Sequence, residues 1–183
     1  MKHTSSFARG LAAVLVSFLA FASLASAQHD HHAAAPASPA KLVRAVRTAT
    51  QQYLNVNNAT SAGYGPLFGC ISGSDHGAMG IHYVNSSLLN GTVNLTTPQA
   101  LIYEPQSDGS LTLVGVEYIV DMATWLQNNS GPPVLDGQVF NLVTSPNRYT
   151  VPNPFFELHV WAWRDNPQGS FVDWNNNVSC NGD

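Results

Sequence analysis

From Gly63 onward, the sequence consists of short apolar runs separated by turn residues, and this alternation restricts the chain to a β-rich fold. Short runs rich in Val, Ile, Leu, Tyr and Trp are typical of strands, and the Gly-containing turns between them are typical of antiparallel connections. Asp108-Gly109, between the second and third runs, predicts a hairpin. The expected strands are residues 79–84, 100–104, 111–120, 138–143 and 155–163.

Helices are expected at two places. Apolar residues recur at three- and four-residue spacing from Leu42, which predicts an amphipathic helix over residues 40–58. A second, short helix is expected at residues 121–128, with Asp121 as its cap. The predicted fold is therefore α+β and mainly antiparallel β, with a barrel-like or strongly curved sheet and one N-terminal helix packed on it.

The beginning of the chain has the pattern of an export signal. Lys2 and Arg9 precede an apolar run, and Ala25-Ser26-Ala27 fits a cleavage site. Because the apolar run is shorter than the ~20 residues that span a bilayer, we expect cleavage and no integral membrane segment afterwards. The expected organisation is a signal peptide at 1–27, a flexible His/Ala/Pro-rich linker at 28–40 and a single β-rich domain at 41–183. The expected location is secreted or periplasmic.

The charge distribution argues against polyanionic partners. Of the 7 Lys and Arg residues, Lys2 and Arg9 lie in the signal, so five remain against 11 acidic residues. Between Arg47 and Arg148 there is no Lys or Arg at all. Binding to nucleic acid or to an anionic membrane surface requires clustered positive charge. The expected partner is therefore a small molecule or a metal ion, and not a nucleic acid.

The two cysteines, Cys70 and Cys180, predict a disulfide, since an even number of cysteines in an exported chain usually pairs. The alternative is a pair of free thiols that bind a metal, but no CxxC spacing supports it. Oligomeric state is not predicted by any feature of the sequence.

The residues with the strongest chemical potential are two histidines and a glutamate on expected strands. His82 and His159 lie within strands, and Glu117 lies in the most apolar strand, where a buried charge needs a partner or becomes protonated. Two imidazoles and a carboxylate suit copper, zinc or iron and leave a coordination position open to water or dioxygen. We predict a metal site at His82, Glu117 and His159, with His76 or Glu157 as a fourth ligand and Glu157 as a candidate base. This requires an inward-facing Glu117 and the two histidines about one strand pair apart.

Two other functions fit the same residues. One is a non-enzymatic small-molecule-binding module whose cavity is lined by the histidines and the glutamate. The other is a structural protein of the envelope, in which His–Glu pairs only satisfy each other. A separate possibility is loose copper or zinc binding by His29, His31 and His32, for which the alternative is a solvated tail.

Several segments resemble a group of small, uncharacterised secreted bacterial proteins. The resemblance implies one compact domain and a bacterial origin, and it brings no activity, cofactor or site residue. Asn176 stands where the group's WNPxVSC ending has Pro. The matching segments are AGYGPLFGC at 62–70, GAMGIHYVN at 77–85, ALIYEP at 100–105, LVGVEYIV at 113–120 and ELHVWAWRDNPQGSFVDWNNNVSC at 157–180.

Overall fold

The computed structural model describes Met1 and residues 39–183, and residues 39–183 belong to one compact unit. The expected signal peptide and nearly all of the expected linker, with its three histidines, lie outside the described residues, so those predictions stay predictions. Within residues 39–183, no helix is both long enough and apolar enough to cross a bilayer.

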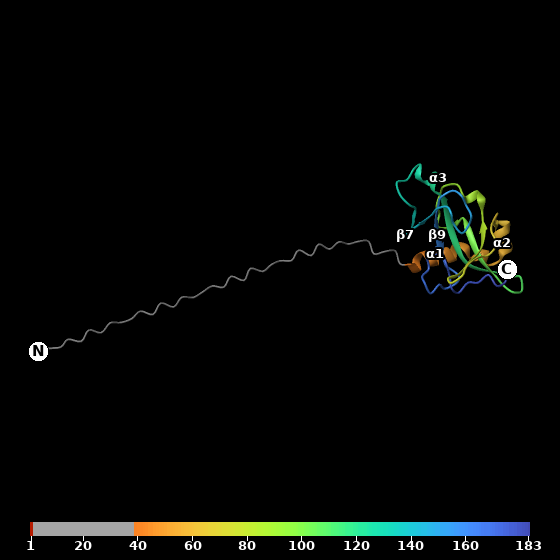
Figure 1. Cartoon of the computed structure of the whole chain (residues 1–183), viewed down its shortest axis with the longest axis horizontal. Helices are drawn as coiled ribbons and strands as arrows, with labels where there is room; N and C mark the ends of the chain where they lie inside the picture. Colours follow the sequence, from red (N-terminus) through yellow and green to blue (C-terminus); the bar gives the residue numbers. More distant parts are fainter. Residues whose placement is uncertain (2–38) are drawn as a thin grey trace. The chain divides into compact units, whose positions relative to one another are not determined.

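A seven-stranded sheet forms the centre of the domain, and all its neighbouring strands are antiparallel (Figure 1). The α+β class with mainly antiparallel strands is thus confirmed. A separate two-stranded hairpin pairs β6 (Val134–Leu135) with β7 (Gln138–Val139). The main sheet has the order β1 (Gly65–Pro66), β3 (Gly77–Val84), β4 (Ala100–Pro105), β5 (Leu111–Asp121), β9 (Phe155–Val160) and β8 (Asn141–Val143), while β2 (Ile71–Gly73) also pairs with β3.

The sheet is not closed into a barrel. No ladder within the described residues joins β8, at one edge, to β1 or β2 at the other. Closure requires a full ladder between the two edge strands, and these edges are only two or three residues long. Of the two expected forms, a barrel-like or a strongly curved sheet, the barrel is therefore wrong, and the architecture is an open sheet.

The helix expected over residues 40–58 is divided into three separate helical segments. They are α1 (Pro39–Thr50), the 3₁₀ helix η1 (Gln51–Leu54) and α2 (Val56–Ser61). The break before α2 lies at Asn55, whose backbone is extended and whose side chain accepts a hydrogen bond from the Asn57 N–H at 3.0 Å. Because α1 begins at Pro39, the helix is not at the N-terminus of the chain, and the prediction of an N-terminal helix is corrected.

Two local predictions around β5, the hairpin before it and the helix cap after it, are confirmed. The expected hairpin joins β4 to β5, and at its turn the Asp108 side chain accepts a hydrogen bond from the Ser110 N–H. Asp121 caps α3 (Met122–Leu126) by accepting from the Thr124 N–H at 2.7 Å. A short 3₁₀ helix, η2 (Ser86–Leu88), follows β3.

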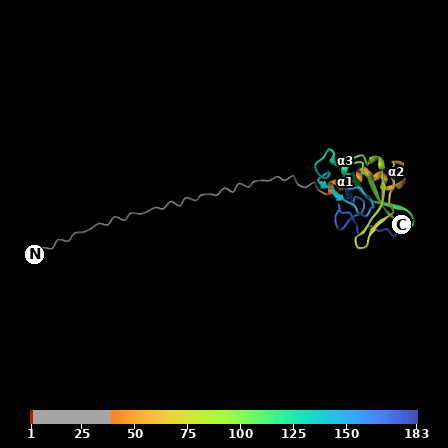
Figure 2. The same cartoon turned by 45° about the horizontal axis from the view of Figure 1, so that its top comes forward.

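The two faces of the sheet differ in chemistry because side chains alternate along each strand. One face forms the main apolar core together with α1, which contributes Leu42 and Val46 (Figure 2). In β9, Phe156, Leu158 and Val160 belong to this face. The alternate residues of β9, Glu157 and His159, point to the opposite face, together with His82 and Glu117. The sheet therefore separates an apolar layer from a face that holds ionisable groups.

A disulfide joins Cys70 to Cys180, with an S–S distance of 2.04 Å, and no cysteine within the described residues is free. The predicted pairing is confirmed, and the alternative of two metal-binding thiols is wrong. The bridge ties the C-terminal segment to the chain that leads into β2. Nearby, Glu104 of β4 accepts hydrogen bonds from Arg164 and from the Ser179 N–H, which attaches the same segment to the sheet.

Candidate metal centre

Three side chains from three strands converge on the polar face of the sheet: His82 of β3, Glu117 of β5 and His159 of β9. One ligating atom from each lies within 4.8 Å of the other two. Glu117 lies opposite His159 in the β5–β9 ladder, and His82 Nε2 lies 3.3 Å from Glu117 Oε2. In the strands between, the register places Ala100 in the row of Glu117, and Ile102 and Gly115 in the row of His82.

The two histidines come from strands that are not neighbours, since β4 and β5 lie between β3 and β9. In a flat sheet, strands three positions apart are separated by about 14 Å. The ring centroids of His82 and His159 are nevertheless only 5.8 Å apart. The two histidines were expected to lie about one strand pair apart. Because two strands lie between theirs, that expectation is wrong, although the rings themselves are close. Curvature of the sheet brings the two side chains together on its concave face.

Both imidazoles are buried and neutral at neutral pH. His82 is 1 % exposed and His159 is 0 % exposed. Burial, then the neighbouring His159 and Arg148, lowers the pKa of His82 from 6.5 to about 3. Burial and Arg148 lower the pKa of His159 to about 3 as well. Neutral imidazole is the form that binds a metal ion, so both side chains are held in the ligating state.

None of the four ring nitrogens of His82 and His159 forms a well-aligned hydrogen bond within the described residues, although His82 Nε2 faces Glu117 Oε2. Buried polar side-chain atoms in native proteins nearly always have such a partner. In a tetrahedral site with metal–ligand distances near 2.1 Å, ligand atoms are about 3.4 Å apart. The 3.3 Å between His82 Nε2 and Glu117 Oε2 already matches this spacing. The ligating atom of His159 lies within 4.8 Å of the other two, so a small side-chain movement would complete the site.

The carboxyl of Glu117 faces inward, as predicted, and is 1 % exposed. Burial and the neighbouring Glu157 raise the pKa of Glu117 well above its usual range. The Tyr149 hydroxyl lies 3.4 Å from Glu117 Oε1 and donates a hydrogen bond to it, and the Tyr149 ring meets the His82 ring edge to face. Because a cation would favour the ionised form of this carboxyl, metal binding and loss of its proton are coupled.

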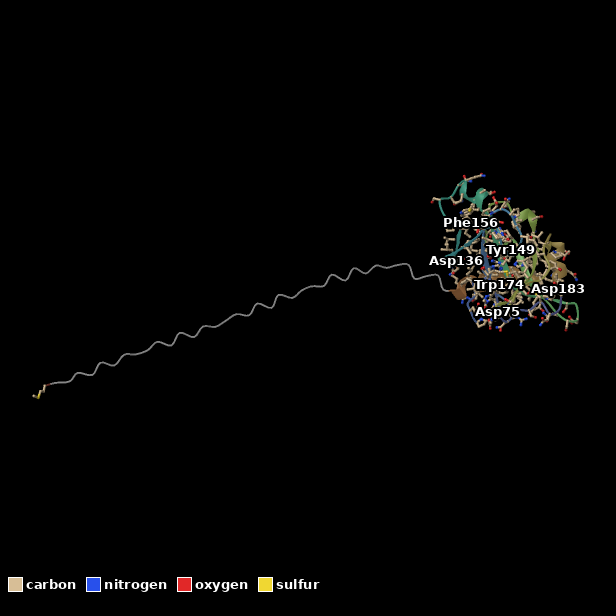
Figure 3. All side chains as sticks on the ribbon, in the orientation of Figure 1. Asp75, Asp136, Tyr149, Phe156, Trp174 and Asp183 are labelled. Carbon is tan, nitrogen blue, oxygen red and sulfur yellow. A yellow bond between two sulfur atoms is a disulfide. The ribbon has the colours of Figure 1, made fainter. Side chains whose placement is uncertain are left out.

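A second acidic group adjoins the first and shares His159 with it. Glu157, Asp173 and His159 also offer ligating atoms within 4.8 Å of one another. Arg148 bridges the two carboxylates: it forms an ion pair with Glu157 and another with Asp173 at 3.0 Å. The guanidinium lies between the Tyr149 and Trp174 rings, which Figure 3 labels. A protein cation thus already neutralises part of this second group.

His76, the other candidate for a fourth ligand, is not brought to the site. It lies on an exposed turn between β2 and β3, and its ring centroid is 6.5 Å from that of Trp174. It belongs to neither group of converging ligands. Glu157, in contrast, is fully buried beside the site, so it is the closer of the two candidates.

A cavity of about 220 Å³ opens beside the three converging residues. Leu67 and Leu89, at 56 % and 45 % exposed, mark its outer end, and the buried His82 and Glu117 mark its inner end. Most of its lining is apolar. The lining residues are Leu67, Phe68, His82, Val84, Leu89, Glu117, Ile119, Asp121, Tyr149, Val151, Asn153 and Phe155.

No protein-family model, curated protein or solved structure matches this chain. The geometry of the site therefore carries the functional argument. Three protein ligands and an adjoining cavity are the arrangement in which a metal ion keeps a position open to an external molecule.

Three residues of the site were not predicted as such: Arg148, Tyr149 and Asp173. All three lie outside strands, in segments without the two-residue periodicity that placed His82 and His159. One signal in the sequence pointed to Arg148, which is the first basic residue after Arg47. In a region with so few Lys and Arg residues, a cation is a natural partner for a buried carboxylate.

Proposed function

We propose that this domain binds one transition-metal ion, copper, zinc or iron, through His82, Glu117 and His159. The observation that carries the proposal is the convergence of two fully buried imidazoles, with no ring nitrogen in a well-aligned hydrogen bond within the described residues, on a buried carboxylate. A purely structural His–Glu pair would satisfy only His82, through Glu117, and would leave both ring nitrogens of His159 without a partner.

Charge balance supports a divalent ion. With their protons removed, Glu117, Glu157 and Asp173 would carry three negative charges, and Arg148 carries one positive charge. The imidazoles are neutral, so a dication makes the cluster neutral overall. A cluster left with a net charge of about −2 in a buried site would be costly, which agrees with the raised pKa of both Glu117 and Glu157.

The arrangement also supports an external ligand on the metal. Two histidines and one carboxylate with open positions form the ligand set of many non-haem iron sites, and zinc uses similar sets with water in the fourth position. We infer that the open position faces the cavity, since His82 and Glu117 line its inner end. Metal-activated water or dioxygen is the chemistry that such a site supplies.

We place this activity in an oxidising compartment outside the cytoplasm. The Cys70–Cys180 disulfide supports this location, as does the export signal expected at residues 1–27. Glu157 stays a predicted base, although its Oε1 is held by Arg148 and only Oε2 lacks a partner.

Elemental analysis tests the proposal. Untagged protein, purified without chelator, would be compared with His82→Ala and His159→Ala variants and with His76→Ala as a matched control. We expect about one equivalent of metal in the wild type and in His76→Ala, and loss in the other two variants. Circular dichroism establishes that each variant is folded. A variant with His29, His31 and His32 replaced by serine removes any contribution of the tail.

The cavity favours one second candidate, a binding module that holds a small molecule without metal. In that case His82 and Glu117 would bind the polar end of the ligand directly. If the wild type lacks metal after reconstitution with each of the three ions, the metal proposal is overturned and this second function takes its place.

A further inference from the structure

The size of the cavity beside the metal centre restricts its ligand to a single ring or its equivalent. Its volume of about 220 Å³ is below the ~300–1,000 Å³ of sites for drug-sized molecules. It is above the ~150 Å³ of an apolar cavity that accepts benzene. A benzene ring with one or two small substituents fits between these limits.

The walls of the cavity favour an aromatic ring. Phe68, Tyr149 and Phe155 all line it, and their rings form a continuous series. The centroids of Phe68 and Tyr149 are 5.9 Å apart, and those of Tyr149 and Phe155 are 5.7 Å apart. Such spacings are those of favourable aromatic pairs, and a ligand ring can join the series with the same geometry.

The charges around the cavity argue against an anionic ligand. Two of its lining residues, Glu117 and Asp121, are acidic, and none of the lining residues is Lys or Arg. The nearest guanidinium, that of Arg148, is already paired with Glu157 and Asp173. With the proposed dication bound, the cluster of carboxylates, Arg148 and metal is already neutral, so a carboxylate ligand would lose its hydration and leave the site with a net negative charge.

The inner end of the cavity requires one polar group on the ligand. His82 and Glu117 are the polar residues there, and the Tyr149 hydroxyl lies beside them. A ligand hydroxyl can bind a metal ion through its oxygen and donate its hydrogen to a carboxylate, whereas a hydrocarbon leaves these groups without a partner.

We propose that the cavity binds an uncharged, single-ring aromatic molecule with one hydroxyl group, of the phenol or benzyl alcohol class. The ring lies among Phe68, Tyr149 and Phe155, and the hydroxyl points to His82 and Glu117. The inference rests on the proposed metal site in one respect, because the hydroxyl oxygen is expected to bind the metal ion. Its other parts are argued from the size, shape and charge of the cavity.

The test uses three probes of matched shape, 4-methylphenol, 4-methylbenzoate and toluene, with zinc-loaded and chelator-treated full-length protein. Binding is measured by ligand-observed NMR titration. Leu89→Trp narrows the outer end of the cavity, and Leu142→Trp is a control at an exposed leucine that does not line it. Zinc content is measured on every sample.

We expect 4-methylphenol to bind zinc-loaded protein about tenfold more tightly than the benzoate or toluene. Leu89→Trp should weaken its binding by a similar factor and leave the zinc content unchanged, while Leu142→Trp should alter neither. Zinc-loaded protein that binds no phenol, or that prefers the benzoate, overturns this inference and leaves the metal site intact. Phenol binding that Leu89→Trp abolishes, in protein that holds no metal after reconstitution with zinc, copper or iron, supports the cavity assignment and overturns the metal proposal.

Discussion

The imidazole rings of His82 and His159 lie 5.8 Å apart although two strands, β4 and β5, stand between their own. In the two strands between, Ala100 lies in the row of Glu117, and Ile102 and Gly115 lie in the row of His82. Curvature of the sheet brings the two imidazoles together across these rows. A Cβ at Gly115 would lie 3.0 Å from the Val160 carbonyl oxygen, so a larger residue there would push β5 away from β9 and disturb the position of His159.

The pH dependence of stability should reveal the two neutral imidazoles. The folded-state pKa of His82 is lowered from 6.5 to about 3, so below pH 6.5 the unfolded chain binds a proton that the folded chain does not. Stability is therefore lost as pH falls through this window, by about 1.4 kcal/mol per pH unit for one histidine. Buried carboxyls with raised pKa act in the opposite direction, so a difference between variants is the cleaner measure.

We expect the stability difference between wild type and His82→Gln to shrink by about 1.4 kcal/mol for each pH unit below 6.5. Urea unfolding across this range, with chelator present, measures it. His76→Gln, at an exposed position, is the control and should track the wild type. A difference that stays constant with pH would mean that His82 is protonated in the folded protein.

Replacing Glu117 by Gln should separate folding from metal binding. Burial and Glu157 raise the pKa of Glu117, so without metal this carboxyl keeps its proton and resembles a neutral amide. Glu117→Gln should thus change the stability of the metal-free protein by only about 1 kcal/mol or less. It should weaken zinc binding by about a hundredfold, because a neutral amide replaces an anionic ligand. Thermal unfolding with and without zinc measures both effects. Equal stabilisation of variant and wild type by zinc would rule out Glu117 as a ligand.

The parts of the fold that sequence predicts are those with local causes. The hairpin between β4 and β5 follows from a turn signal between two apolar runs, and the cap on α3 from Asp121 at a helix start. In β9, two-residue alternation correctly places Glu157 and His159 on one face and Leu158 on the other. These features depend on a few neighbouring residues, so no partner strand is needed to recognise them.

Strand order and the surroundings of the site have long-range causes, which sequence pattern does not contain. The run at 138–143 was expected as one strand, but it is divided between β7, which pairs with β6, and β8, which pairs with β9. Arg148 lies in an irregular segment, and only the packing of that segment over the sheet brings it to Glu157. The ligands were predictable as residues on strands, and the curvature that brings them together was not.

Removal of the disulfide should destabilise the fold and leave the ligands in place. Cys70 and Cys180 are separated by 110 residues, and closing a loop of this size is worth about 4–5 kcal/mol in the chain-entropy model. The double variant Cys70→Ala/Cys180→Ala should lose about that much stability in urea unfolding. Neither cysteine belongs to the groups of converging ligands, so the metal content of the folded variant should stay near that of the wild type. A parallel loss of metal would show that the bridge also shapes the site.

Arg148 should stabilise the domain through its pairing with buried Glu157. Glu157 is fully buried, so Arg148→Met leaves a carboxylate without its cation, at a cost of about 3 kcal/mol. The double variant Arg148→Met/Glu157→Gln should recover most of this loss, because the unpaired charge is gone. Arg164→Met, which breaks a more exposed pair with Glu104, should cost only about 1 kcal/mol. Urea unfolding of the wild type, Arg148→Met, Glu157→Gln and the double variant, with chelator present, completes the cycle, and Arg164→Met is measured beside them. Additive losses in the double variant would mean that Arg148 and Glu157 act independently.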